Sequence, residues 1–460
     1  MSLIKSISGI RGTIGGKVDE NLTPIDAVKF AAAYGSWLKG QSSKEHVKVV
    51  IGRDARISGE MIQNLVQYTL IGLGIDVVNI GLSTTPTVEV AVPMEKADGG
   101  IILTASHNPK EWNALKLLNN KGEFVSDQDG KAILKIAQEN DFSFATVDHL
   151  GKLTHDDQYI DLHIEKVLAL PLVASEAIQK KKFRVVVDAV NSTGGIAIPR
   201  LLERLGVEVV KLYCEPNGHF PHNPEPLKEH LGDICKRVVE EKADFGIVVD
   251  PDVDRLAFIT DKGEMFGEEY TLVACADYVL GKAKGNVVSN LSSSRALRDI
   301  AQKHGVSYSA AAVGEVNVVT EMKRVEAIIG GEGNGGIIYP ELHYGRDALV
   351  GVALFLSLLA ERGGSVQQLR ESYPAYFMSK NKIQLTEQIN PDQILKAMEQ
   401  KYAHEQTTTI DGLKIDFADS WVHLRKSNTE PIIRIYTEAK SQKEADALAH
   451  RFIEEMQALI

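Results

Sequence analysis

The segment FRVVVDAVNSTGGIAIPRLLERLGVEVVKLY, residues 183–213, carries the pattern that decides the fold. It contains an apolar strand rich in valine, a polar loop, an amphipathic helix, a glycine at position 206 and a second apolar strand. A glycine just past the last helical turn is a common helix end, because it adopts the left-handed conformation at little steric cost. A strand, a helix and a second strand in this order predict a right-handed βαβ unit with parallel strands.

The same order of elements recurs at two other places along the chain. Residues 47–81 begin VKVVIGRDAR and end LVQYTLIGLGIDVVNIG, and residues 285–314 read GNVVSNLSSSRALRDIAQKHGVSYSAAAVG. Copies separated by roughly a hundred residues or more indicate related α/β domains rather than a tight solenoid.

The last part of the chain follows a different pattern. The stretches KNKIQLTEQ, TTTIDGLKIDFADSWVHLRKS and PIIRIYTEA predict strands, and NPDQILKAMEQKYA and SQKEADALAHRFIEEMQALI predict helices. These elements are typical of an α+β domain. We therefore expect an α/β protein of four domains, three related α/β domains and a C-terminal α+β domain, at residues 1–151, 152–255, 256–372 and 373–460.

Composition narrows the classes of function. The net charge of −11 over 460 residues argues against a nucleic-acid partner, which requires a basic surface. Local arginines can still hold a small anionic ligand. The cysteines Cys214, Cys235 and Cys275 are far apart, without metal-site spacing or a disulfide framework, as is typical of a reducing compartment.

Two stretches bear on the location of the protein. The N-terminal sequence MSLIKSISGIRG lacks the apolar core of a signal peptide. The longest apolar run, residues 348–360, is too short to span a bilayer and predicts a core helix. We therefore expect a cytoplasmic protein with no membrane partner; the oligomeric state is left open.

A first polar cluster ends an apolar strand in IILTASHNPKEWNALKL, residues 101–117. The Asn-Pro pair predicts a turn that presents Ser106 and His107, with Lys116 ten residues past the serine. Taken singly, each side chain has an ordinary interpretation: a turn or helix-capping serine, a loop histidine and a solvated lysine.

A second cluster lies in FGIVVDPDVDRLAFIT, residues 245–260. Asp250, Asp252 and Asp254 alternate at a strand end, and carboxylates this close repel one another unless a cation lies among them. Carboxylate oxygens favour a hard ion, so we expect one Mg²⁺ per chain; the alternative is a polar surface turn. Arg255 follows directly and can pair with an acid or reach a ligand phosphate.

Two further clusters have the chemistry of ligand-binding loops. In IIGGEGNGGIIY, residues 328–339, glycines leave room for a ligand beside Glu332 and Asn334; a tight hairpin is the alternative, and the dinucleotide-binding spacing is missing. In LRKSNTEPIIRIYTEA, residues 424–439, cationic and neutral donors predict a phosphate site, with a solvated turn as the alternative. The donors are Arg425, Ser427, Asn428, Thr429 and Arg434. A serine beside a divalent metal can carry a phosphoryl group while an arginine-rich loop holds a second phosphate.

The motifs TASHNP, DPDVDR, GEGNGG and RKSNTEPIIR, with SGIRG near the N-terminus, occur in the order seen in the α-D-phosphohexomutases. The chain resembles that superfamily from end to end. The resemblance implies four domains around a deep cleft. It also implies an enzyme that interconverts hexose 1- and 6-phosphates through a phosphoserine and a 1,6-bisphosphate, which also serves as activator.

The resemblance implies a role for each candidate residue. Ser106 resembles the phosphoserine, and an oxygen of that phosphoserine would complete the Mg²⁺ site formed by Asp250, Asp252 and Asp254. Lys116 and Arg11 resemble the groups for proton transfer and charge stabilisation. The remaining roles are the active-site shell for His107 and Arg255, sugar binding for Glu332 and Asn334, and binding of the non-transferring phosphate for Arg425, Ser427, Asn428, Thr429 and Arg434.

The chain departs from the common family pattern at two loops. Asn334 and Gly336 stand where many members have serine and histidine, and Pro251 and Val253 stand where glycines are frequent. The sugar loop resembles a branch often assigned to glucosamine phosphate, and an ammonium at C2 would be attracted by the acidic surplus of the protein. We therefore expect glucosamine phosphate as substrate, with glucose and mannose phosphates as alternatives.

Two other classes of function are open to the same residues. A Mg²⁺-dependent phosphatase would form an acyl phosphate on Asp250, which leaves TASHNP without a role. A silent sugar-phosphate sensor would bind without turnover. Only a mutase carries stable phosphate on Ser106.

Overall fold

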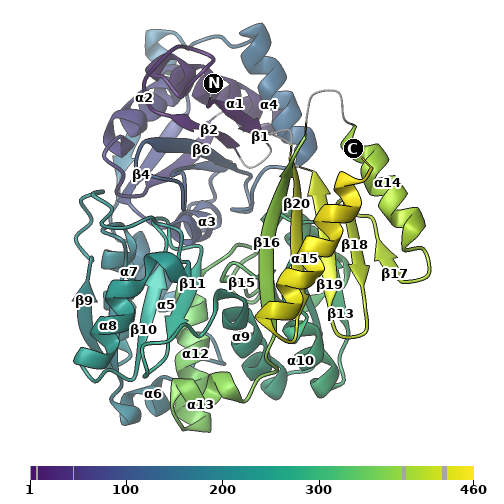
Figure 1. Ribbon diagram of the computed structural model, residues 1–460. Coiled ribbons are helices and arrows are strands. Elements are labelled where there is room, and N and C mark those ends of the chain that lie inside the picture. The colour runs from purple at the N-terminus through teal and green to yellow at the C-terminus, as the bar shows by residue number, and fades with distance from the viewer. Residues whose placement is uncertain (1, 7–8, 45, 386–389, 427–431, 460) are drawn as a thin grey trace. The chain divides into compact units, whose positions relative to one another are not determined.

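A computed structural model describes residues 2–6, 9–44, 46–385, 390–426 and 432–459 (Figure 1). The chain forms two compact units. The first contains residues 1–279 and 334–367, and the second contains residues 280–333 and 368–460. Among the described helices, none combines the length and the apolar character that a membrane span requires.

The first sheet of the first unit has seven strands in the order β1-β2-β6-β5-β3-β4-β7. The strands are β1 (Ile4–Ser6), β2 (Gly9–Thr13), β3 (Lys48–Arg53), β4 (Asp76–Leu82), β5 (Gly99–Leu103), β6 (Trp112–Leu118) and β7 (Leu153–His155). Strand β3 pairs in parallel with β4 and β5, whereas β6 returns antiparallel to β5. The helices α1 (Pro24–Gln41), α2 (Gly59–Gly72), α3 (Thr85–Met94) and α4 (Asp127–Glu139) accompany this sheet.

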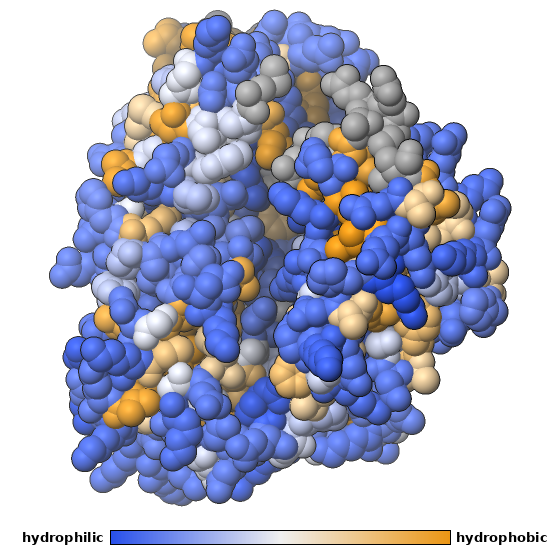
Figure 2. Space-filling view, viewed as in Figure 1, coloured by the Kyte–Doolittle hydropathy of each residue, from blue (hydrophilic) through white to orange (hydrophobic). Residues whose placement is uncertain are grey.

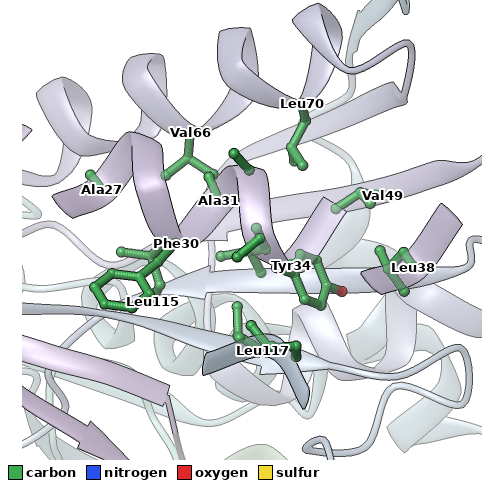
Figure 3. Packing of buried hydrophobic residues seen from close by; sticks show 14 of the residues in the cluster. Ala27, Phe30, Ala31, Tyr34, Leu38, Val49, Val66, Leu70, Leu115 and Leu117 are labelled. Carbon is green, nitrogen blue, oxygen red and sulfur yellow. The ribbon is translucent and has the colours of Figure 1, made fainter. Parts of the chain in front are cut away.

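The core of this part forms around α1 (Figure 3). Phe30, Ala31 and Tyr34 of α1 are buried among side chains of α2, β3 and β6, including Val66 and Leu115. The Tyr34 hydroxyl donates to the carbonyl oxygen of Leu118 at 2.7 Å, so its polar end is satisfied inside the core. This packing holds in place β5 and β6, two inner strands of the sheet that carry polar residues of the candidate site.

The second sheet of the first unit has the order β11-β10-β8-β9. Its strands are β8 (Arg184–Asp188), β9 (Glu208–Leu212), β10 (Phe245–Val249) and β11 (Leu256–Ile259). Strand β8 is parallel to β9, as the segment 183–213 predicts. It is also parallel to β10, and β11 is antiparallel to β10. The helices are α5 (Tyr159–Leu168), α6 (Ser175–Lys181), α7 (Gly194–Arg204), α8 (Gly232–Glu240) and α9 (Glu268–Lys282), the last of which ends in the second unit.

The predicted core helix is confirmed. Helix α12 (Ala348–Arg362) follows the short strand β15 (Gly336–Ile338), and every residue from Ala348 to Ala360 is buried. Asp347 caps the helix, because its Oδ1 accepts from the backbone N–H of Leu349 at 2.8 Å and of Val350 at 3.3 Å. A helix that is apolar on all sides is covered on all sides, which positions the residues just before it firmly.

The second unit contains a parallel arrangement and an antiparallel sheet. Strand β12 (Asn286–Asn290) is parallel to β13 (Tyr308–Ala311) and β14 (Ala327–Glu332), with helices α10 (Ala296–His304) and α11 (Glu315–Arg324). The antiparallel sheet has the order β16-β20-β19-β18-β17. Its elements are β16 (Phe377–Gln384), β17 (Gln406–Thr408), β18 (Leu413–Asp416), β19 (Trp421–Lys426), β20 (Ile432–Ala439), α14 (Pro391–Lys401) and α15 (Gln442–Gln457). Helix α13 (Val366–Glu371) leads from the first unit into the second.

The predicted class of fold, α/β with an α+β C-terminal part, is confirmed by these sheets. The four domain boundaries stay predictions. On the face of the molecule in Figure 2, hydrophilic side chains cover most of the surface and hydrophobic ones are scattered among them, as is usual for a folded chain.

Candidate active site

Ser106 lies in the turn after β5, residues 104–109, which we call the serine turn. Its side chain points at residues 250–255 after β10, which we call the aspartate loop. Its Oγ donates to Asp250 Oδ2 at 2.7 Å, and the side chain is 3% exposed. Its backbone has φ of +49°, a left-handed conformation that costs a non-glycine residue free energy. The Ser106 backbone N–H donates to Thr104 Oγ1 at 2.9 Å, which helps to hold this conformation. Strain of this kind clusters at functional sites.

Arg56 holds the serine turn through hydrogen bonds to backbone carbonyl oxygens. Its guanidinium donates to the carbonyl oxygens of Ser106, Pro109 (2.7 Å), Asn108 (2.7 Å) and Trp112 (3.0 Å). Its Nε donates to Asp54 Oδ2 at 3.0 Å, and both side chains are fully buried. A planar guanidinium with five donors can satisfy so many acceptors at once, whereas a lysine cannot.

Two predicted residues flank the serine turn. Arg11 of β2 donates from Nη1 to Asn108 Oδ1 at 2.8 Å, and burial lowers the pKa of its guanidinium. His107 Nδ1 lies 3.4 Å from Ser106 Oγ. Burial and the cations Arg255, Arg11 and Arg346 lower the pKa of His107 to about 2, so its imidazole is neutral at neutral pH.

The three predicted aspartates form one buried cluster. Asp250, Asp252 and Asp254 have no exposed surface, and one carboxylate oxygen of each lies within 4.8 Å of the others. Asp250 Oδ1 accepts from the backbone N–H of both Asp254 and Arg255 at 3.2 Å, which curls the loop around it. Val253 has φ of +65°, a left-handed conformation that glycine adopts at the least steric cost.

Cations face the aspartate cluster from two directions. Lys116 Nζ lies 2.7 Å from Asp252 Oδ2 and 3.5 Å from Asp254 Oδ2, and Arg346 Nη2 lies 2.7 Å from Asp254 Oδ2. Burial alone would lower the pKa of Lys116, but Asp252 and Asp254 outweigh it and raise that pKa above its ordinary value. The expected alternative for Lys116, a solvated side chain, is wrong, because only 4% of the residue is exposed.

The aspartates differ in their electrostatics. Burial, with the charges of Asp252 and Asp254, raises the pKa of Asp250 well above its usual range. Burial also acts to raise the pKa of Asp252, but Lys116 and a hydrogen bond from Thr85 bring it below its usual range. The Thr85 hydroxyl donates to Asp252 Oδ2 at 2.5 Å from the first turn of α3.

The donor set fits a hard divalent cation. Within the described ranges, Asp252 Oδ1 and Asp254 Oδ1 are buried without a hydrogen-bond donor. A buried carboxylate oxygen without a partner is costly, and a cation bound between the carboxylates would remove that cost. All the ligand atoms are oxygens, which favours Mg²⁺ over softer metals.

Two further predicted residues of the first unit, Arg255 and Asn334, contact other groups of the protein. Arg255 Nη1 lies 3.0 Å from Glu225 Oε1, so it pairs with an acid, one of the two expectations for this residue. Asn334 Oδ1 accepts from the backbone N–H of Gly336 at 3.2 Å, which shapes the turn before β15.

The remaining predicted residues lie in the second unit. Glu332 ends β14, and its Oε1 accepts from Asn290 Nδ2 at 2.8 Å and from the backbone N–H of Gly314 at 3.1 Å. Arg425 and Arg434 lie directly opposite each other on β19 and β20, and Arg434 lies opposite Lys382 of β16. Directly opposed residues share a face of the sheet, so the three cations form a row. The predicted residues Ser427, Asn428 and Thr429 lie outside the described residues.

Sequence reasoning missed residues that act through tertiary contacts. Arg56 follows a strand end in GRDAR, and Arg346 precedes the core helix in HYGRDA. Both arginines lie at the ends of elements. The sequence around Arg56 does not indicate its contact with Ser106, and the sequence around Arg346 does not indicate its contact with Asp254. Lys382 could have been found only from the register of β16 with β20.

The fold and the site geometry agree with the sequence comparisons. Four stretches match the domains of the phosphoglucomutase/phosphomannomutase family: residues 3–144 and 157–263 match alpha/beta/alpha domains I and II, residues 267–376 match domain III, and residues 382–455 match the C-terminal domain.

Similar proteins cover nearly the whole chain. A phosphoglucomutase/phosphomannomutase of Thermococcus kodakarensis is 36% identical, over 94% of this chain and 95% of the relative. A probable phosphoglucosamine mutase of Methanopyrus kandleri is 32% identical, over 97% and 96%. A crystal structure of a phosphoglucomutase/phosphomannomutase family protein of Burkholderia thailandensis has 25% identity and a TM-score of 0.86, over 99% of this chain and 98% of that chain.

The chain therefore belongs to the phosphoglucomutase/phosphomannomutase family of the α-D-phosphohexomutase superfamily. It is a phosphohexomutase, an isomerase that transfers a phosphoryl group within its substrate. The family expected from the motifs is confirmed. The names of the relatives divide between phosphoglucosamine mutase, in one case with phosphogalactosamine mutase, and phosphoglucomutase/phosphomannomutase, so they leave the sugar open.

Proposed function

We propose that Ser106 carries the phosphoryl group and that glucosamine phosphate is the preferred substrate. The observation that carries the first part is the 2.7 Å contact between Ser106 Oγ and Asp250 Oδ2 inside the buried aspartate cluster. Phosphorylated Ser106 gives its phosphoryl group to a hexose 1- or 6-phosphate, which forms a bound 1,6-bisphosphate. This intermediate reverses its orientation in the site, and its other phosphoryl group is transferred back to Ser106. A hexose 1,6-bisphosphate acts as activator by phosphorylating free Ser106.

Asp250, Asp252 and Asp254, with an oxygen on Ser106, would hold Mg²⁺. When bound, the ion supplies positive charge that neutralises the phosphoryl oxygens. Asp250 also orients Ser106 Oγ by accepting its hydrogen bond, and Thr85 orients Asp252. The rigid curl of the aspartate loop keeps these carboxylates in place during phosphoryl transfer, in which catalysis rests on positioning and charge.

The cations around the cluster would stabilise and move charge. Lys116 and Arg11 serve proton transfer and charge stabilisation beside Ser106, and the raised pKa of Lys116 keeps its ammonium charged before substrate binds. Neutral His107 adds a hydrogen-bonding group beside the serine without adding charge. Arg255, which directly follows Asp254, is a further residue of the proposed active-site shell.

The sugar and its second phosphate would be held by residues of the other loops. Glu332 is oriented by Asn290 and Gly314, and with Asn334 it offers acceptors for sugar hydroxyls. The non-transferring phosphate is assigned to the cationic row of Arg425 and Arg434 and to the donors Ser427, Asn428 and Thr429. Lys382 joins this set because it is in register with Arg434.

The choice of glucosamine phosphate rests on the loop sequence and on relatives. Gly336 removes the family's histidine and Asn334 replaces a hydroxyl, in a loop typical of an amino-sugar branch. Relatives from Methanopyrus kandleri and Pyrococcus abyssi, 32% and 33% identical, are named probable phosphoglucosamine mutases. The alternative is a phosphoglucomutase/phosphomannomutase, the name of the Thermococcus kodakarensis relative.

A substrate panel tests this choice. The value of kcat/KM is measured for the 1- and 6-phosphates of glucosamine, glucose and mannose on one preparation of the enzyme. We expect glucosamine phosphate to give the highest value, with measurable turnover of glucose phosphate. A tenfold preference for glucose or mannose phosphate, equal to about 1.4 kcal/mol of transition-state discrimination, would overturn the amino-sugar assignment.

A further inference from the structure

A second cluster of metal-ligating side chains lies in the first unit, apart from the aspartate loop. His163, His343 and Asp347 place one ligand atom each within 4.8 Å of one another. His163 Nε2 lies 2.9 Å and His343 Nε2 lies 3.2 Å from the same oxygen, Asp347 Oδ2. His163 and Asp347 have no exposed surface, and the side chain of His343 is 11% exposed.

We propose that His163, His343 and Asp347 bind a divalent transition-metal ion of the zinc type. Two imidazoles with one carboxylate favour such an ion, whereas the all-oxygen aspartate loop favours Mg²⁺. The two nitrogen–oxygen separations, 2.9 and 3.2 Å, are hydrogen-bond distances. They are close to the spacing of about 3.3 Å that metal–ligand bonds of about 2.0 Å impose in a tetrahedral site, so a small outward shift of the ligands would admit the ion. A water molecule admitted beside the partly exposed His343 completes the coordination.

The surroundings of both histidines suit metal binding. A histidine that binds a metal through Nε2 carries its proton on Nδ1 and needs an acceptor there. His163 Nδ1 lies within hydrogen-bond distance of Thr87 Oγ1, at 3.0 Å. His343 Nδ1 lies 3.4 Å from Glu89 Oε2, which is an ion-pair distance and not a hydrogen bond. Thr87 and Glu89 are both on α3, so one helix lies beside both imidazoles.

The carboxylate of Asp347 is oriented by α12. Asp347 Oδ1 is held by the first backbone N–H groups of α12, which leaves Oδ2 directed at the histidines. Glu89, which is 1% exposed, places a second carboxylate beside His343.

The ion would connect three separate stretches of the chain beside the active site. Thr87 and Glu89 lie on α3, His163 lies on α5, and His343 and Asp347 precede α12. The same stretches reach the aspartate loop: Thr85 donates to Asp252, and the backbone N–H of Ala348 donates to the carbonyl oxygen of Val253 at 3.2 Å. The ion therefore acts as a structural cross-link behind that loop.

Cobalt(II) titration tests the proposal without reference to activity. The full chain is freed of metal with a chelator, returned to excess Mg²⁺ to fill the all-oxygen site, and titrated with Co²⁺. A four-coordinate site with imidazole ligands gives Co²⁺ a strong visible absorption band, whereas octahedral oxygen coordination gives a weak one. We expect one equivalent of strongly absorbing Co²⁺ per chain, displaced by one equivalent of Zn²⁺.

Two ligand variants and a matched control decide the assignment. His343→Gln and His163→Gln should abolish the band, with far-UV circular dichroism confirming the fold; two sites of different burial keep the test valid if one variant misfolds. His149→Gln, at an exposed histidine in the same unit, should retain the band. Absence of the band in the unchanged chain, or its survival in a folded His343→Gln or His163→Gln protein, would overturn the proposal.

Discussion

At Ser106, one hydroxyl group is placed by contacts from three directions. The left-handed backbone of Ser106 is held by Thr104 and Arg56, and its Oγ meets Asp250. Because each contact comes from a different part of the chain, the serine cannot relax without displacing buried polar groups. Such pre-organisation would lower the barrier to the proposed phosphoryl transfer through Ser106, because little reorganisation is left to the reaction itself.

Asp252→Asn should remove most of the Mg²⁺-dependent activity. The amide keeps the shape of the side chain but removes a charge from the proposed metal site and from the pair with Lys116. We expect kcat/KM to fall by at least about a hundredfold, in the range seen when a group that stabilises transition-state charge is removed. The measurement is mutase activity in chelator-treated enzyme against added Mg²⁺, and full Mg²⁺-dependent activity in the variant would place the metal elsewhere.

Arg425→Ala should mainly weaken substrate binding. The side chain lies on the cationic row of β19 and β20, where it would contact a phosphate that is held in the ground and transition states alike. We expect a raised KM with a smaller change in kcat. The matched control is Lys426→Ala, because Lys426 is the next residue of β19, on the opposite face, and pairs with Asp392 at 2.7 Å. A pure kcat defect in Arg425→Ala would move this arginine into the chemical step.

On the scale of an element, β19 contains a buried histidine that should make the second unit sensitive to acid. His423 is 1% exposed, and its Nδ1 lies 2.8 Å from Ser292 Oγ. Burial, together with Lys414 and Arg425, lowers its pKa from 6.5 to about 4. Between these two values the unfolded chain binds a proton that the folded chain does not, so the free energy of unfolding should fall as pH falls through this window.

Urea unfolding at pH 7, 6 and 5 measures this effect. We expect the midpoint to decrease with pH in the unchanged chain and to decrease less in His423→Gln, which cannot gain the proton. His404→Gln, at a histidine whose side chain is 70% exposed, should behave like the unchanged chain. An identical pH dependence in His423→Gln would show that another group controls acid sensitivity.

The elements themselves follow from local sequence. The valine-rich strand, the amphipathic helix and Gly206 of residues 183–213 predict β8, α7 and β9, and Gly206 has φ of +70° as the helix end requires. The contact of Lys116 with Asp252 is harder to predict. It depends on the antiparallel return of β6, which pairs Lys116 with Ile102, and the sequence does not state that register.

On the scale of the whole molecule, the sequence names the candidate site residues more readily than the residues that hold them. Short motifs contain the three aspartates, Ser106 and Lys116, and the structure brings these side chains together, while their roles stay predictions. Arg56 and Arg346 could not be predicted, because their partners lie about fifty and ninety positions away and ordinary arginines at element ends carry no signal of tertiary contact. The histidine cluster with Asp347 was missed for the same reason, since His163 and Asp347 are far apart in sequence.

Phosphopeptide mapping tests the central claim, a mutase that works through phosphoserine 106, most directly. The enzyme is incubated with glucose 1,6-bisphosphate, digested and analysed by mass spectrometry, before and after addition of a hexose monophosphate. Ser106→Ala is the control, and it should bind substrate without turning it over. The account predicts acid-stable phosphate on Ser106 that is lost to the added monophosphate. Turnover with no phosphate on Ser106, or with a labile acyl phosphate on Asp250 in its place, would contradict it.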